Sequence, residues 1–74
     1  MPERKEVYDR LKKSKLTQVW LINQLRERGI VTERSEISAV FAGTRNGLKV
    51  EAILNTTNDI LDEYETKFAA APKT

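Results

Sequence analysis

Apolar residues recur at three- and four-residue steps along most of the chain, which is the spacing of one face of an α-helix. Near the start, Val7 and Leu11 lie four residues apart, and charged residues fill most positions around them. This pattern predicts an amphipathic helix over about residues 3–13. Apolar and polar residues never alternate over more than a few positions, so the pattern favours an all-α fold.

A second helix is predicted to begin after Thr17, because threonine is a residue type that caps helix N-termini well. The inward stripe of this helix consists of Leu21, Ile22 and Leu25. A polar turn follows the stripe. Gly29 is then expected to end the helix, since glycine adopts the left-handed conformation without strain.

A third helix is predicted soon afterwards, with Thr32 as its cap and Gly43 as its end. Ile37, Val40 and Phe41 have the spacing of one buried face. The outward face consists of small and polar residues: Arg34, Ser35, Ser38, Ala39 and Ala42. A helix that lies in a groove needs short side chains of this kind, so we interpret residues 17–42 as a helix-turn-helix.

The longest periodic segment spans residues 48–68. Positions with helical spacing in it are Val50, Ile53, Leu54, Thr57, Leu61, Tyr64 and Phe68. Poor helix formers cluster near Thr56–Asn58, so two interpretations stay open: one long helix, or two helices separated by a kink there. The chain is short enough for a single domain, predicted over residues 1–68, with a disordered tail over residues 69–74.

The composition argues against enzymatic chemistry. The 74 residues contain neither His, the commonest general acid or base, nor Cys, so a nucleophilic thiol, a disulfide and a typical zinc site are all disfavoured. The three glycines are isolated, which excludes a glycine-rich phosphate loop. Asp62, Glu63 and Glu65 have no metal-binding spacing and fit a solvated helix face. We therefore expect a protein without catalytic activity, metal or cofactor.

The charges are unevenly distributed along the chain. Residues 1–49 carry eleven Lys and Arg against six Asp and Glu, whereas residues 50–74 carry two against five. A basic front and an acidic rear suggest that one end of the molecule meets a polyanion. No run reaches the roughly 18 apolar residues of a membrane span, and the N-terminus lacks the apolar segment of a signal peptide, so we expect a cytoplasmic protein.

The predicted third helix offers a route to DNA binding, because an α-helix fits the major groove and its N-terminal residues reach base edges. Arg34, Ser35 and Ser38 lie on the exposed side near its start, and an arginine there is suited to donating two hydrogen bonds to a guanine. Gln18, at the start of the second helix, fits a phosphate contact. Further donors follow the third helix, namely Thr44, Arg45, Asn46 and Lys49. The alternative for Arg34 is surface pairing with a neighbouring glutamate, Glu33 or Glu36.

Three segments of the chain resemble the Cro and lambda-repressor-like (XRE-type) regulators. They are LTQVWLINQL, SEISAVFAG and TRNG, and the resemblance covers roughly Val7 to Leu54. The matching positions are Leu16–Gln18, Ile37–Ser38, Val40 and Gly43. Between Leu25 and Ile37 the chain has about five residues more than is usual in that family, and Ala39 stands where a long polar residue is common.

The resemblance implies a lambda-repressor-like helix-turn-helix bundle of four to five helices with a long C-terminal helix. It further implies binding to double-stranded DNA by a transcriptional repressor of phage or mobile-element origin, acting as a homodimer and needing no small-molecule ligand. By resemblance, Gln18 contacts phosphate, and Arg34, Ser35 and Ser38, with Glu36 beside them, occupy base-reading positions. Thr44, Arg45 and Asn46 fall in the phosphate-contacting loop.

The end of the C-terminal helix offers a candidate dimer contact, formed by Leu61, Tyr64 and Phe68. The alternative is that these residues pack within the chain over the first helix. A second class of function also stays open: a small protein-interaction module, such as an antirepressor or an assembly adaptor, built on the same scaffold. A DNA-packaging or excision factor with the same motif is a subcase. The acidic rear half and the outward face of the third helix, where Arg34 is the one charged residue among small side chains, favour this class.

Overall fold

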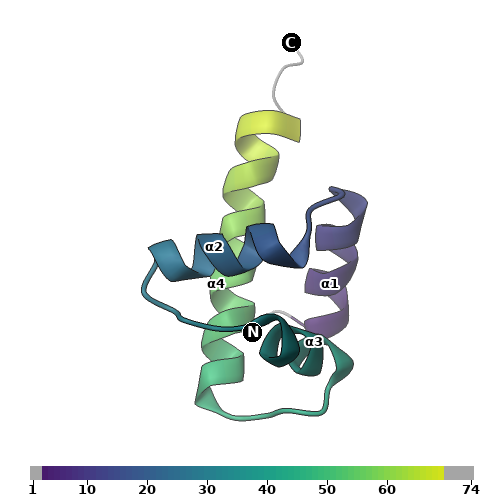
Figure 1. Ribbon diagram of the computed structural model, residues 1–74. Helices are drawn as coiled ribbons and strands as arrows, with labels where there is room; N and C mark the ends of the chain where they lie inside the picture. The colour runs from purple at the N-terminus through teal and green to yellow at the C-terminus, as the bar shows by residue number, and fades with distance from the viewer. Residues whose placement is uncertain (1–2, 70–74) are drawn as a thin grey trace.

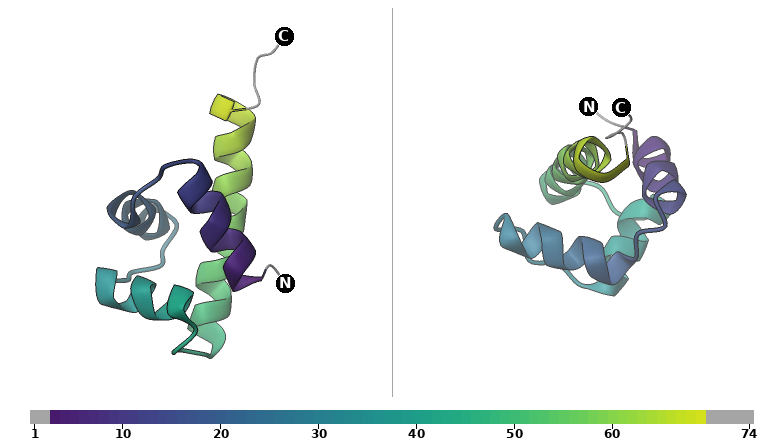
Figure 2. Two further views of the ribbon diagram at one scale, coloured as in Figure 1. Left: turned by 90° about the vertical axis from the view of Figure 1, so that its right-hand side faces the viewer. Right: turned by 90° about the horizontal axis from the view of Figure 1, so that it is seen from above.

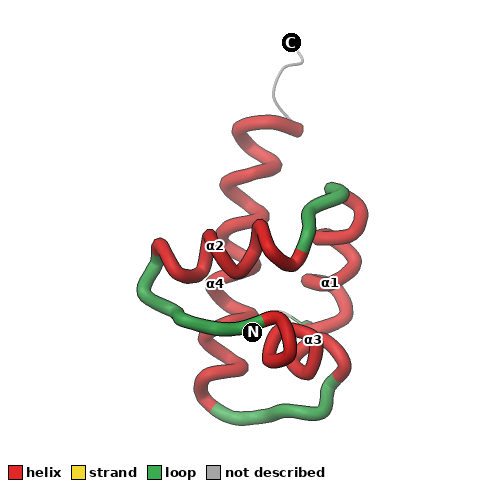
Figure 3. Tube along the Cα trace, in the orientation of Figure 1, coloured by secondary structure: helices red, strands yellow, loops and turns green. Residues whose placement is uncertain are grey.

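The computed structural model describes residues 3–69, and within them the fold is all-α, as predicted, with no strand. The α-helices are α1 (Arg4–Lys13), α2 (Gln18–Glu27), α3 (Arg34–Ala42) and α4 (Leu48–Tyr64), and α4 continues into a π-helical turn, η1 (Glu65–Ala69). Three loops connect the four α-helices (Figures 1 and 3). No helix in this part of the chain combines the length and apolar character that crossing a membrane requires.

The helix α4 is the axis of the molecule. α1 packs along one side of α4, while α2 crosses α4 and contacts α3, which also contacts α1 (Figure 2). The C-terminal end of α4 extends past α2, as Figure 1 shows. α2 and α3 therefore share one side of the bundle, with α1 and α4 forming the support behind them.

The core contains the apolar residues that the helical spacing predicted on the inward face of each helix. Those buried are Val7, Leu11, Leu21, Ile22, Leu25, Ile37, Val40, Ile53, Leu54, Ile60 and Leu61. Ile60, which is 2% exposed, is an addition to the predicted stripe, and Phe41 and Val50 are only partly buried against this core. Thr57 is fully buried, and its hydroxyl oxygen has no hydrogen-bond partner among residues 3–69.

Helix α2 begins and ends as its sequence predicted. The Thr17 hydroxyl accepts a 3.0 Å hydrogen bond from the amide of Trp20, which caps the first turn. At the other end Gly29 has φ +91°, and the Ile30 amide donates to the carbonyl of Leu25 at 2.9 Å. This six-to-one bond and the left-handed glycine form a Schellman motif, which satisfies the last carbonyls of the helix.

The predicted cap of the third helix is wrong. Glu33 is the N-cap of α3, and no side chain bonds to the amides of its first turn. The Thr32 hydroxyl instead donates to the Glu36 carboxylate at 2.7 Å. Thr32 is one residue too early for a cap and is 5% exposed, so its hydroxyl is satisfied by a side chain rather than by the helix backbone.

The C-terminal segment is one α-helix through Thr56–Asn58, so the kinked alternative is wrong. Poor intrinsic propensity there is overridden by burial of one face of the helix, which includes Ile53, Thr57 and Ile60. The change in helical geometry comes later, where η1 follows Tyr64. Ala69, predicted to begin the disordered tail, ends η1, and residues 70–74 lie outside the described residues.

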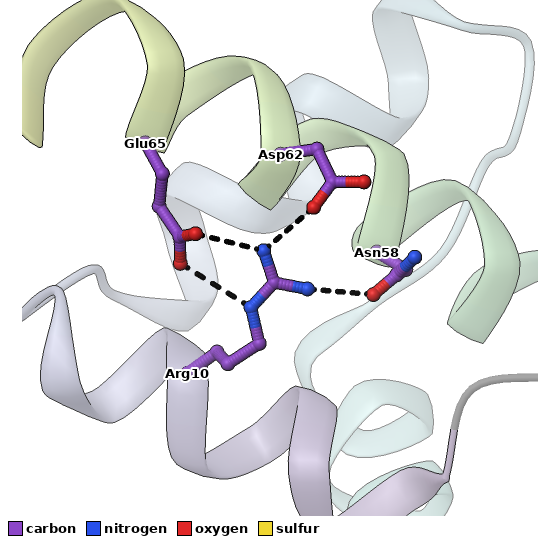
Figure 4. Close-up of polar contacts among 4 residues, drawn as sticks. All are labelled: Arg10, Asn58, Asp62 and Glu65. Carbon is purple, nitrogen blue, oxygen red and sulfur yellow. Dashed lines mark hydrogen bonds and ion pairs between the residues drawn. The ribbon is translucent and has the colours of Figure 1, made fainter. Parts of the chain in front are cut away.

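Arg10 links α1 to the C-terminal half of α4 through hydrogen bonds and ion pairs (Figure 4). Its guanidinium donates to Asn58 at 2.6 Å, to Asp62 at 2.8 Å and to both carboxylate oxygens of Glu65 at 3.1 and 3.2 Å. The hydrogen bond to Glu65, opposed by burial and assisted by Asp62, raises the pKa of Arg10 above its ordinary value. Arg10 thus connects three successive turns of the helix that supports α2 and α3.

Candidate nucleic-acid interface

Helices α2 and α3 meet at two residues for which the sequence predicted DNA contacts. Ser38 Oγ donates to Oε1 of Gln18 at 3.4 Å, across a separation of 20 residues in the sequence. Both side chains line an open hollow of about 300 Å³, together with Tyr8, Phe41 and Ala42. The rings of Tyr8 and Phe41, which both line this hollow, pack against each other with their centroids 5.3 Å apart. The start of α2 is therefore held beside the middle of α3.

The outward face of α3 forms a continuous strip, here called the α3 strip. It consists of Arg34, Ser35, Ser38, Ala39 and Ala42, all exposed except the half-buried Ala39. Arg34 makes no hydrogen bond or ion pair within residues 3–69, so the alternative pairing with Glu33 or Glu36 does not form. Its guanidinium is accordingly available to a ligand.

Glu36 gathers three partners on the other side of α3. Its carboxylate accepts the Thr32 hydroxyl at 2.7 Å and lies 3.1 Å from Lys49 Nζ and 3.6 Å from Arg45 Nη1. The hydrogen bond from Thr32, followed by that from Lys49, lowers the pKa of Glu36, and the charge of Arg45 adds to the effect. Glu36 therefore faces the loop and the start of α4, and not the α3 strip.

The α3 strip is thus bordered by polar groups on both sides. Glu36 and Ser38 are two residues apart, which separates them by about 200° around the helix axis. Gln18 consequently flanks the strip on the side of Ser38, while Arg45 and Lys49 flank it on the side of Glu36. Figure 2 shows α3 projecting from the bundle beside α2, with the 43–47 loop leading from its end to α4.

The loop after α3 carries the remaining predicted contacts. Gly43, with φ +84°, ends the helix, and the Thr44 amide donates to the carbonyl of Ala39 at 3.1 Å. The Thr44 hydroxyl donates to the same carbonyl at 3.3 Å, so in this state it helps to close α3. Asn46 is exposed and has no hydrogen-bond partner within residues 3–69.

The predicted dimer contact is wrong in one of its members. Leu61 is completely buried in the core of its own chain, as the alternative of internal packing predicted, and presents no surface to a second copy. Tyr64 is half-buried and packs edge-on against Trp20, with ring centroids 5.8 Å apart. The side chain of Phe68 lies outside the described residues.

One basic residue near this surface was not predicted from the sequence. The guanidinium of Arg4, at the start of α1, lies against Gly43 at the end of α3. The sequence pattern placed Arg4 only on the polar side of an amphipathic helix. Its position beside the 43–47 loop depends on the packing of α1 against α3, for which the local sequence contains no signal.

Comparison of the chain with protein-family models, with curated proteins and with solved structures finds no significant match. A functional assignment therefore depends on the residues of the α3 strip and its two borders, and on the chemistry they present.

Proposed function

We propose that this chain binds double-stranded DNA through a helix-turn-helix formed by α2 and α3, with α3 in the major groove. The observation that supports this most directly is the α3 strip bordered by Gln18 on one side and by Arg45 and Lys49 on the other. A reading helix needs short outward side chains toward the bases and donors on both sides for the two phosphate backbones.

The roles follow from the positions of the side chains. Arg34 lies in the first turn of α3, is exposed and is unpaired, so it is the base-reading residue, with guanine as the preferred base. Ser35 supplies a shorter donor along the same strip, and Ser38 adds one where its hydroxyl exchanges the 3.4 Å bond to Gln18 for a base. The methyl groups of Ala39 and Ala42 offer apolar contact, for instance with the methyl group of a thymine.

The phosphate contacts belong to the edges of the strip. Gln18 stands at the start of α2, where backbone amides point outward and an anion is favoured. On the opposite edge are the cations Arg45 and Lys49, and the Thr44 and Asn46 side chains add uncharged donors. The α3 strip contributes few specific contacts, so a transcriptional regulator of the Cro type would act as two copies on paired half-sites about 34 Å apart.

Duplex affinity measured against salt concentration tests the proposal. Fluorescence anisotropy with a labelled random-sequence duplex of about three helical turns should give a logarithmic affinity that falls linearly with the logarithm of salt. Each phosphate neutralised contributes a slope of about −0.9, so Arg45 and Lys49 alone predict about −1.8 per bound copy. Absence of binding at 50 mM salt, with random duplexes and with duplexes from in vitro selection, would remove the proposal.

Sequence selectivity is tested with Arg34→Ala. On a selected duplex this change should cost about 1–3 kcal/mol and relax the preference at one base pair, because a bidentate contact is lost. On random duplex it should have a much smaller effect. Arg26→Ala is the matched control, because Arg26 is exposed and lies at the opposite end of α2 from Gln18.

A second candidate is a protein-interaction module, such as an antirepressor or an assembly adaptor, on the same scaffold. It is favoured by the small residues of the α3 strip and by exposed apolar residues elsewhere, since Val19 and Val31 are 52% and 68% exposed. The same salt titration separates the two candidates. A chain that binds no duplex even at low salt has the properties of the interaction module.

A further inference from the structure

A small hollow of about 190 Å³ lies where the start of α1, the loop after α3 and the start of α4 meet. Arg4, Arg45 and Asn46 provide the donors of its lining, and Glu51 is the acidic member. The described lining carries two positive charges against one negative charge. Its apolar part is formed by three side chains, Val40, Val50 and Leu54.

The guanidinium of Arg4 occupies the space that a side chain at residue 43 would take. A Cβ atom on Gly43 would lie 2.8 Å from Nη1 and 2.9 Å from Cζ of Arg4, closer than such atoms approach. Glycine at this position therefore serves the left-handed turn that ends α3 and also makes room for a guanidinium from another helix. As a result, Arg4 lies beside the loop that follows the reading helix.

Neither Arg4 nor Asn46 is engaged elsewhere. No hydrogen bond or ion pair within the described chain involves the Arg4 guanidinium, and Glu51 lies beyond ion-pair distance of it. Arg45 has a partner, Glu36, but at 3.6 Å and with an Arg45 side chain that is 58% exposed. An exposed pair of this kind is weak, so Arg45 is able to turn toward a stronger anion.

We propose that this hollow holds one sugar–phosphate unit of the DNA backbone, with Arg4 on its phosphate, Arg45 on the neighbouring phosphate of the same strand and Asn46 as a further donor. The inference rests on the proposed function and extends it to a residue outside the helix-turn-helix. Planar guanidinium groups match the geometry of phosphate oxygens, and the apolar wall of the hollow suits the carbon face of a deoxyribose. The two neighbouring anion contacts, at Arg45 and Arg4, then follow one strand past the end of α3.

The experiment compares Arg4→Gln with Lys5→Gln in the full chain on the random-sequence duplex. Both changes remove one positive charge from exposed, adjacent residues of α1, but Lys5 does not line the hollow. Arg4→Gln should make the salt slope shallower by about 0.9 per bound copy and weaken affinity equally for all sequences. Lys5→Gln should change the slope by much less. Arg4→Lys should restore most of the slope, because it restores the charge.

The outcomes separate this inference from the proposed function. If the wild-type chain binds duplex and Arg4→Gln behaves like Lys5→Gln, the hollow is not a backbone site and the helix-turn-helix proposal stands. If the wild-type chain binds no duplex at low salt, both proposals fall together. Circular dichroism of each variant shows whether the helices are retained. If the spectrum of Arg4→Gln is altered, Arg4→Lys is compared with Lys5→Arg instead, and these two variants are expected to differ in their affinity for the duplex.

Discussion

The hydroxyl of Thr32 donates a 2.7 Å hydrogen bond to Oε1 of Glu36, the residue whose carboxylate also contacts Arg45 and Lys49. Thr32 was predicted from the sequence to cap α3, but its hydroxyl orients the acidic side chain of Glu36 instead. Because Glu36 is oriented, the two cations along one edge of the α3 strip have a partner in the unbound chain. If the chain binds DNA as proposed, this arrangement reduces the side-chain entropy that the binding costs.

The Glu36 contacts predict a pH-dependent stability. The pKa of Glu36 is lowered in the folded chain, chiefly by the hydrogen bond from Thr32 and then by that from Lys49. Its carboxylate therefore stabilises the fold fully above the ordinary glutamate pKa of about 4.3 and loses this effect as pH falls through the folded value. Glu36→Gln should lower the free energy of unfolding by about 1 kcal/mol at pH 7, and the difference from wild type should shrink below about pH 4.3.

Urea denaturation at several pH values checks this, with Glu33→Gln as the control. Glu33 is exposed, lies at the start of the same helix and has no side-chain bond to it. If Glu36→Gln and Glu33→Gln lower the free energy of unfolding equally and with the same pH profile, the loss comes from removing a negative charge near the start of α3. It then does not come from the contacts of Glu36.

Thr57 predicts a stabilising substitution. Its hydroxyl is buried without a hydrogen-bond partner, and such a group costs about 1–3 kcal/mol. Valine has nearly the same shape and no hydroxyl, so Thr57→Val should raise the free energy of unfolding by about 1 kcal/mol. Thr57→Ser keeps the hydroxyl and removes a buried methyl group, so it should lower stability by about 1 kcal/mol. Thermal denaturation measures both, and a less stable valine variant would contradict the unpaired state of the hydroxyl.

Lys15 predicts a second stabilising change. Lys15 has φ +60°, and it stands where α1 ends with a hydrogen bond from the Leu16 amide to the Leu11 carbonyl. Glycine is favoured at such a left-handed position, but here the residue carries a side chain. The left-handed conformation costs a residue with a side chain about 1–2 kcal/mol, and glycine removes this cost. Part of the gain is offset, because glycine makes the unfolded chain more flexible and so loses more entropy on folding. Lys15→Gly should therefore raise stability by about 0.5 kcal/mol. Lys13→Gly, at the last residue of α1, should lower stability by about 0.5–1 kcal/mol, and similar effects of the two changes would exclude this explanation.

The helical spacing of apolar residues predicted the ends of the α-helices to within four residues, because each helix buries one face against the others. Signals contained in a few neighbouring residues were also correct: Thr17 caps α2, and Gly29 and Gly43 end their helices. Of the two alternatives for the C-terminal segment, the single helix is correct and the kink near Thr56–Asn58 is wrong, since intrinsic propensity is weaker than the burial of one face over the length of α4.

The candidate site was predictable only where its residues belong to a single element. The exposed side of α3 followed from the helix period, whereas the partner of each charged residue did not. Glu36 has Arg34 nearby in sequence but pairs with Arg45 and Lys49, because the 43–47 loop returns the chain to the start of α3. Leu61 was offered for a dimer because nothing in the local pattern distinguishes an internal contact from an external one. The approach of Arg4 to Gly43 likewise arises from tertiary packing alone.

The support behind the α3 strip predicts that Arg10 matters more for stability than a typical surface arginine. Its guanidinium connects α1 with Asn58, Asp62 and Glu65, and its side chain is only 28% exposed. Arg10→Ala should lower the free energy of unfolding by about 1–2 kcal/mol, because several charge-assisted bonds are lost together.

Arg10→Lys keeps the charge but cannot form the same fork, so it should recover less than half of the loss. Arg28→Ala is the matched control, because Arg28 also pairs with α4, but through one residue, Glu63 at 2.9 Å, where Arg10 has three partner residues. An exposed pair contributes about 0.2–1 kcal/mol, so Arg28→Ala should cost less than Arg10→Ala. Urea denaturation in low and high salt decides the matter. Equal losses for the two alanine variants, or complete rescue by lysine, would mean that Arg10 acts as a simple surface charge and that the connection between α1 and α4 is made by the core alone.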